Sequence, residues 1–227
     1  MQMRNARRAG GTCAVGGAAL LFIGTYLHPM GADPNDPAAA FAEYAQDRLW
    51  IASHLVQLAG VAAMLAALLF LTEQLEASRR SSVARIAAAG AIASLALAFA
   101  LQAVDGIALK NMVDAWAAAP ESEKEGVFHA AFAVRQLEIG LASMLSLSLG
   151  LTMSLYGIAL LGDEKYPKWF GGVAIAAGAP TMVAGVVMAY TGFSGLAMAI
   201  NMPANLLLLL WMLALAWFMW RRGEAVP

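Results

Sequence analysis

The chain has 227 residues, of which 61% are hydrophobic and only 13% are charged, and its formal net charge is −1. Soluble domains carry about 25% charged residues, so this chain has too few charges to cover a water-facing surface. The near-neutral charge and the lack of a Lys/Arg-rich run give no indication of nucleic-acid binding. The single cysteine, Cys13, excludes an intramolecular disulfide.

Six apolar stretches follow one another along the chain, each near or above the length of about 20 residues that a helix needs to cross a bilayer. A transmembrane helix satisfies its own backbone hydrogen bonds, and these stretches lack the alternation of barrel strands. We therefore predict an all-α polytopic membrane protein, in contact with the lipid bilayer, that forms a single domain over residues 1–227. The predicted spans are residues 11–28, 51–72, 86–108, 128–161, 169–191 and 202–220.

The first stretch begins with a basic segment, MQMRNARR, which is typical of a secretory signal. The apolar part that follows is long, and no small-residue cleavage pattern stands out after it. Five further spans come later in the chain. We therefore interpret this stretch as a retained first span.

The loop between the first two spans, ADPNDPAAAFAEYAQDRLW, predicts a short amphipathic helix on the outer surface. Asp36 is a typical N-cap residue, and Pro37 suits the first helical position. Phe41, Tyr44 and Arg48 then recur at three- and four-residue spacing, which places them on one helical face. A second loop carries Ser122-Glu-Lys-Glu125, a capping-box pattern that predicts a helix start near Glu123, well before the apolar part of the fourth span.

Basic residues are distributed unequally between the two sets of span ends. Lys and Arg concentrate on the cytoplasmic side of membrane proteins, so the richer set is expected to face the cytoplasm. We predict a protein of the bacterial cytoplasmic (inner) membrane with both termini in the cytoplasm. The richer set has ten members (Arg4, Arg7, Arg8, Arg79, Arg80, Arg85, Lys165, Lys168, Arg221 and Arg222), and the poorer set has three (Arg48, Lys110 and Lys124).

The fifth span carries Gly171, Gly178, Gly185 and Gly192, one glycine every seven residues. Small residues on one stripe of a membrane helix let another helix approach closely. The main interpretation is tight packing between helices. The stripe is also the candidate surface for a homo-oligomer or for docking on a larger membrane complex.

Polar side chains gather near the outer ends of the spans, judged by counting about 20 residues from each inner end. This layer is the candidate ligand site. Arg135 and Glu138 have two interpretations: an ion pair at a helix end, or ligand contacts in which Arg135 binds an anionic group and Glu138 a proton or cation. The candidate ligand-binding residues are Arg135, Glu138, Asp105, Gln57, Gln102 and Asn205.

All three histidines of the chain, His28, His54 and His129, fall in this outer layer on different predicted helices. They are candidate ligands for zinc or copper, which accept imidazole nitrogens. A b-type haem between His54 and His129 is an alternative. Hydrogen-bonded interfacial histidines are the third interpretation, and no close-spaced metal motif selects among them.

The passage LGLTMSLYGIALLGDEKYPKWFGGVAIAAG has a glycine-containing span end, a short basic turn with proline and a glycine-rich second helix. With DPNDPAAAFAEYAQDR before the second span and His129 opening the fourth, the chain resembles a large family of small bacterial six-helix integral membrane proteins of unknown function. The resemblance implies the six-helix fold. It implies no activity and no catalytic residues.

Three kinds of function stay open on the sequence. The first is a binding protein or enzyme with an outward-facing polar site that holds a metal, haem or a small amphipathic ligand. The second is a small transporter or channel-like protein, and the third is an accessory subunit of a larger membrane complex. The inner halves of the predicted spans are almost purely apolar, which argues against a polar path through the membrane and favours the first.

Overall fold

The computed structural model describes residues 2–76 and 78–224, and within these ranges all regular secondary structure is helical. Six helical segments are long and apolar enough to cross a membrane, which confirms the predicted fold class. The elements are α1 (Gln2–Leu27), α2 (Pro37–Gln46), α3 (Trp50–Leu75), α4 (Ser81–Gln102), η1 (Ala103–Leu109), α5 (Lys110–Ala118), α6 (Lys124–Leu161), α7 (Lys168–Thr191) and α8 (Gly195–Glu224).

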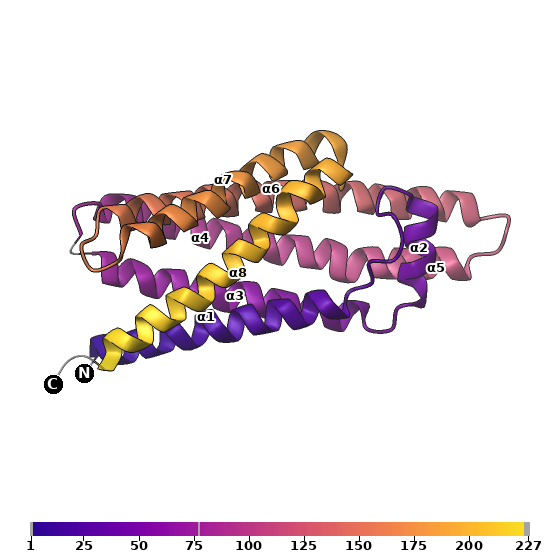
Figure 1. The fold of residues 1–227 in the computed structure, drawn as a ribbon. Coiled ribbons are helices and arrows are strands. Elements are labelled where there is room, and N and C mark those ends of the chain that lie inside the picture. Colours follow the sequence, from indigo (N-terminus) through magenta and orange to yellow (C-terminus); the bar gives the residue numbers. More distant parts are fainter. Residues whose placement is uncertain (1, 77, 225–227) are drawn as a thin grey trace.

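The six membrane-spanning segments form a ring in which each packs on its neighbours in sequence, and α8 closes the ring against α1. Figure 1 shows the start of α1 and the end of α8 together at one end of the bundle, which we call the terminal end. Helices α2 and α5 lie at the opposite end, which we call the loop end. The two helices diverge towards the loop end, where α8 lies farther from α1 than it does at the terminal end (Figure 1).

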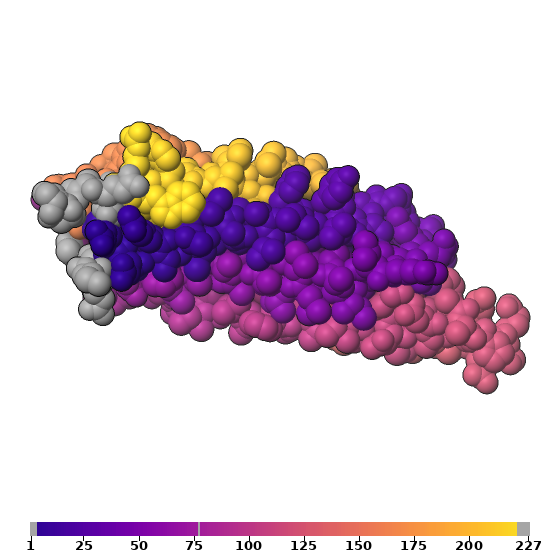
Figure 2. All heavy atoms as spheres, turned by 90° about the horizontal axis from the view of Figure 1, so that it is seen from below, coloured from indigo at the N-terminus to yellow at the C-terminus, as the bar shows by residue number. Residues whose placement is uncertain are grey.

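The third span is longer than predicted, because α4, η1 and α5 continue one another from Ser81 to Ala118. Its middle part, η1, is a π-helix. Helix α6 has 38 residues, which corresponds to a length of about 57 Å at 1.5 Å per residue. Its loop end and α5 project beyond the rest of the molecule (Figures 1 and 2). The prediction that the fourth helix begins well before its apolar part is therefore confirmed.

The two predicted helix starts in the loops have different outcomes. Helix α2 begins as predicted, because the Asp36 carboxylate accepts hydrogen bonds from the amides of Ala38 and Ala39 and Pro37 occupies the first turn. Helix α6 begins at Lys124, but its N-cap is Glu123 and no side chain caps it. The predicted capping box is therefore wrong, since a capping box needs the serine itself in the N-cap position.

The predicted glycine stripe packs inside the chain, against α6. A Cβ atom built on Gly178 would lie 2.6 Å from the carbonyl oxygen of Gly150, and one on Gly171 would lie 2.7 Å from that of Gly157. Gly185 faces the Ser143 backbone in the same way. The helix-packing interpretation therefore holds for Gly171, Gly178 and Gly185, which α6 covers and which are not free to dock a second copy or a larger complex. Gly192, the fourth member, ends α7 with a φ of 61°.

Two groups of buried apolar side chains stabilise the bundle. The larger one fills the terminal half and includes Leu68, Leu71, Tyr156, Phe170 and Trp211. The smaller one lies at the loop end, where α2 covers η1, α5 and α6. Its buried members are Ala40, Phe41, Tyr44, Trp50, Leu109, Val113 and Ala131.

Candidate functional site

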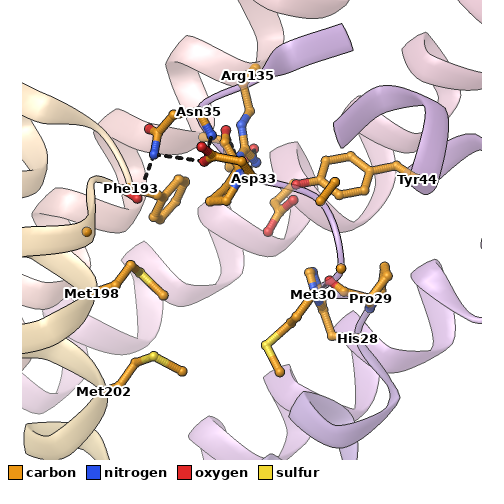
Figure 3. Close-up of a pocket in the computed structure, with 16 residues that line it drawn as sticks. His28, Pro29, Met30, Asp33, Asn35, Tyr44, Arg135, Phe193, Met198 and Met202 are labelled. Atoms are coloured by element: carbon orange, nitrogen blue, oxygen red, sulfur yellow. Dashed lines mark hydrogen bonds and ion pairs between the residues drawn. The ribbon is translucent and has the colours of Figure 1, made fainter. Parts of the chain in front are cut away.

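A cavity of about 750 Å³ lies at the loop end, beside the smaller apolar group. Its walls come from the loop after α1, from Tyr44 of α2, from Asp105 of η1, from α6 and from the start of α8. Figure 3 shows Met198 and Met202 of α8 on one side of the space and His28 and Met30 on the other. The cavity therefore lies where the chain leaving α1 faces the start of α8, and it has an apolar side and a polar side.

The loop over the cavity, residues 28–35, is held by polar contacts to two other parts of the chain. The Glu43 carboxylate of α2 accepts hydrogen bonds from the amides of Gly31 and Ala32, at 2.9 and 2.8 Å. The Asn35 side-chain nitrogen donates to the carbonyl oxygen of Phe193, in the turn before α8, at 2.9 Å (Figure 3). These contacts fix the loop against α2 and α8 and define the polar side of the cavity.

Arg135 and Glu138 form a closed, buried ion pair on α6. Nη1 of Arg135 lies 2.6 Å from both carboxylate oxygens of Glu138, and the two residues are 5% and 3% exposed. Nη2 donates to the carbonyl oxygen of Pro34 at 3.1 Å. The guanidinium also lies over the rings of Tyr44 and Phe193, 5.7 and 4.9 Å from their centroids. The ion-pair interpretation therefore describes this structure, since Glu138 already occupies the guanidinium that an anion would need.

His54 and Asp105 form a second buried pair, between α3 and η1. Nε2 of His54 lies 3.1 Å from Oδ2 of Asp105, and Nδ1 lies 2.7 Å from the carbonyl oxygen of Trp50. A carbonyl oxygen can only accept, so Nδ1 carries a hydrogen. One further proton must then lie between Nε2 and Oδ2 to complete that hydrogen bond. The pair is either an imidazolium with a carboxylate or a neutral imidazole with a carboxylic acid, and its total charge is zero in both forms.

The position of Asp105 depends on the π-helix. A π-turn contains an extra residue, which changes the direction of the side chains around it, and such turns are frequent at functional sites. The indole nitrogen of Trp50 donates to the Asp105 carbonyl oxygen at 3.0 Å and helps to satisfy this irregular backbone. Oδ1 of Asp105 is buried and has no hydrogen-bond partner among the residues that the structure describes.

His28 lies in the cavity wall just after α1, and its ring packs on His54 and on Trp50. Its ring centroid is 4.9 Å from that of His54 and 4.8 Å from that of Trp50. Nδ1 donates to the carbonyl oxygen of Pro29 at 2.7 Å. Burial, followed by the neighbouring His54, lowers the pKa of His28 below its ordinary value. Its Nε2 is therefore a free acceptor, without a hydrogen-bond partner in the described part of the chain.

Tyr44 brings a hydroxyl group into the cavity from α2. Its ring packs on Trp50 with a centroid distance of 4.2 Å, and Figure 3 shows the hydroxyl pointing towards the cavity. Burial raises the pKa of Tyr44 to about 12, so the hydroxyl stays protonated near neutral pH. Tyr44 and His28 thus both pack on the Trp50 indole ring.

The remaining predicted site residues lie outside this cavity. His129 is an exposed residue of α6, and its Nε2 lies 3.9 Å from the Glu125 carboxylate. Gln57 and Gln102 contact each other at 3.5 Å, and Asn205 is exposed on α8. Neither these four residues nor His54 line the cavity, although His54 contacts Asp105, which does.

The histidines do not come together as a metal site. Among residues 2–76 and 78–224, no group of three or more His, Cys, Asp or Glu side chains is placed to hold a metal ion. Both ring nitrogens of His54 have partners, and His129 is on the surface. The geometry therefore gives no support to the predicted three-histidine site or to the predicted haem between His54 and His129.

Several lining residues were not predicted from the sequence as site residues. They come from the loop, from α2 and from the start of α8, and a sequence without coordinates gives no signal that these segments meet. Tyr44 was noticed only for its helical spacing with Phe41. The additional lining residues are Pro29, Met30, Gly31, Ala32, Asp33, Pro34, Asn35, Tyr44, Phe193, Gly195, Met198 and Met202.

Comparisons with family models, with curated proteins and with solved structures gave no match. The resemblance to small bacterial six-helix membrane proteins therefore stays a prediction. Functional inference depends on the cavity itself.

Proposed function

We propose that this protein binds an amphipathic, lipid-like molecule in the cavity between α1 and α8. The polar head lies against His28, Tyr44 and the loop 28–35, and the apolar chain lies along Met198 and Met202. The observation that carries the proposal is the division of one cavity of about 750 Å³ into a polar side and a methionine-lined side. Ligand pockets commonly have volumes of about 300–1,000 Å³ and place a few polar groups in an apolar wall.

The apolar side of the cavity continues into a surface suited to lipid chains. Met202 is 54% exposed and Met30 is 64% exposed, although both line the cavity. Near the end of α1, Phe22 and Tyr26 are also exposed. An alkyl chain whose head is in the cavity can therefore leave it sideways, between α1 and α8, into the hydrocarbon of the bilayer.

The terminal half of the bundle supports a closed site rather than a path through the membrane. It is filled by large buried side chains such as Leu71 and Trp211. The polar groups there satisfy one another: the Thr72 and Tyr156 hydroxyls lie 2.7 Å apart, and those of Ser94 and Ser148 lie 2.8 Å apart. Binding is therefore better supported than transport.

We infer that the cavity faces the outer half of the bacterial inner membrane and that both termini are cytoplasmic. The α3–α4 turn with Arg79 and Arg80 and the α6–α7 turn with Lys165 lie at the terminal end, beside the start of α1 (Figure 1). Basic residues concentrate on the cytoplasmic side of membrane proteins, which supports a loop end that faces outward.

Photolabelling in lipid nanodiscs tests the binding site. The probes share one saturated chain that carries a diazirine, with either a glycerol ester or a carboxylate as head group. We expect adducts concentrated at residues 28–35 and 198–202. Adducts spread evenly over the lipid-facing surface would contradict the proposal.

A cavity-filling substitution sharpens this experiment. Gly195 lines the cavity and a Cβ atom there meets no atom within 4 Å, so Gly195→Trp has room to place an indole in the binding space. Gly172 is the matched control, because its Cβ position is equally open but lies on the exposed side of α7. Gly195→Trp should remove most of the labelling, and Gly172→Trp should leave it unchanged.

A further inference from the structure

We infer that the head group bound here is uncharged and carries hydroxyl groups, as in a monoacylglycerol. This inference rests on the proposed function and adds the chemical class of the ligand. Two sets of polar atoms in the cavity wall support this class: those that already have partners and those that are free to bind a head group.

The buried charges of the wall are already paired. Arg135 is neutralised by Glu138 at 2.6 Å, and His54 shares a proton with Asp105 at 3.1 Å. Asp33 also lines the cavity, but it is an exposed residue that water can solvate. A charged head group placed among these buried pairs would bring a net charge that the pairs do not neutralise, which is unfavourable in a site of low polarity.

An anionic head is disfavoured for a second reason. The guanidinium of Arg135 is the obvious anion-binding group, but both of its terminal nitrogens have partners, in Glu138 and in the Pro34 carbonyl. A carboxylate or phosphate bound to the remaining N–H groups would share a cation that Glu138 already neutralises, so the site would gain a buried net negative charge.

A cationic head meets a similar obstacle. Oδ1 of Asp105 lacks a partner, but the protein covers it, so a head group in the cavity does not reach it in this conformation. The aromatic faces that suit a quaternary ammonium group belong to Tyr44 and Phe193. The Arg135 guanidinium already lies over both of them.

The free polar groups suit hydroxyls instead. Nε2 of His28 is an acceptor, and the Tyr44 hydroxyl both donates and accepts. Both residues line the same cavity and pack on Trp50, so both groups are offered to a head bound there. A diol can donate one hydrogen bond to His28 and exchange another with Tyr44 without introducing any charge.

A panel of four photoreactive probes with one common chain tests this inference in nanodiscs. The heads are a glycerol ester, a carboxylate, a primary amine and a quaternary ammonium group, and the measurement is the probe concentration that gives half-maximal labelling of residues 198–202. We expect the glycerol ester to bind at least about tenfold more tightly than each charged probe, because the buried ion pairs of the wall do not neutralise a charged head.

Two variants test the assigned contacts. Tyr44→Phe removes one hydroxyl and His28→Phe removes the acceptor, while each keeps an aromatic ring on Trp50. Each should weaken binding of the glycerol ester about fivefold, the value of one net hydrogen bond. Tyr190→Phe is the matched control, because Tyr190 is 86% exposed on α7, and it should have no effect.

The outcomes separate the two proposals. Cavity labelling with equal affinity for all four heads, or tighter binding of a charged head, would overturn the inference about the head group and leave the amphiphile site standing. An unchanged affinity in both Tyr44→Phe and His28→Phe would overturn the assigned contacts. Failure of every probe to label the cavity would refute the proposed function itself.

Discussion

His54 and Asp105 share one proton across the contact between α3 and η1, with Nε2 and Oδ2 separated by 3.1 Å. The Trp50 carbonyl oxygen holds the other imidazole nitrogen at 2.7 Å and determines where its hydrogen lies. Because Asp105 of this pair lines the cavity, the neutrality of the pair limits the charge that the cavity accepts. The pair also predicts how substitutions of Asp105 change the stability of the folded protein.

Asp105→Leu should destabilise the folded protein more than Asp105→Asn. With leucine, Nε2 of His54 has no partner and remains buried, which costs about 1–3 kcal/mol. With asparagine, a neutral imidazole that keeps its Nδ1 hydrogen can accept from the new amide. Thermal unfolding in detergent measures both variants, and equal melting temperatures for the two would contradict the shared proton.

Separating the Arg135-Glu138 pair should be more harmful than replacing it. Both side chains are nearly fully buried, so Arg135→Met leaves an unpaired carboxylate in the interior at a cost of about 3–5 kcal/mol. The double variant Arg135→Met/Glu138→Leu leaves no buried charge and should recover much of this loss. Size-exclusion chromatography and thermal unfolding of the single and double variants make the comparison. A double variant less stable than Arg135→Met would show that the pair acts mainly through other contacts, such as that with Pro34.

Gly178 and Gly172 should respond oppositely to alanine, although both lie on α7. At Gly178 the new methyl would lie 2.6 Å from the Gly150 carbonyl oxygen, and such overpacking costs about 1–3 kcal/mol. At Gly172 the methyl meets nothing within 4 Å, and alanine is a better helix former by up to about 1 kcal/mol. Melting temperatures in detergent should fall for Gly178→Ala and stay level or rise for Gly172→Ala. A loss at both positions would indicate that Gly172 packs on something outside the chain.

The architecture was largely predictable from the sequence, because it depends on patterns within single segments. The length of each apolar run determines the spans, and the Asp36-Pro37 pair identifies the start of α2. The Gly171, Gly178 and Gly185 spacing correctly predicted close helix packing. It did not identify the partner helix, because α6 and any foreign helix would need the same small residues.

The candidate site was predictable only in part, for reasons of geometry. His28, Asp105, Arg135 and Glu138 were placed correctly in one polar layer by counting along each helix. Depth alone does not give the direction of a side chain around the helix axis, so His129 was grouped with them although it faces outward. The π-helix that positions Asp105 has no recognised sequence signal in AVDGIAL, and its extra residue changes the directions of the side chains around it.

The stability of the protein should fall on mild acidification, and His28 should account for part of this loss. Burial and the neighbouring His54 lower the pKa of folded His28, with Asp105 and Asp47 acting in the opposite direction. As the pH falls below about 6.5, the unfolded chain gains a proton that folded His28 does not yet accept, so the free energy of unfolding decreases until the folded pKa is passed. Melting temperatures measured between about pH 8 and about pH 5 should therefore drop further for the natural chain than for His28→Phe. Identical drops for both chains would mean that His28 titrates alike in the folded and unfolded states, and would remove the basis for treating its Nε2 as a buried, neutral acceptor.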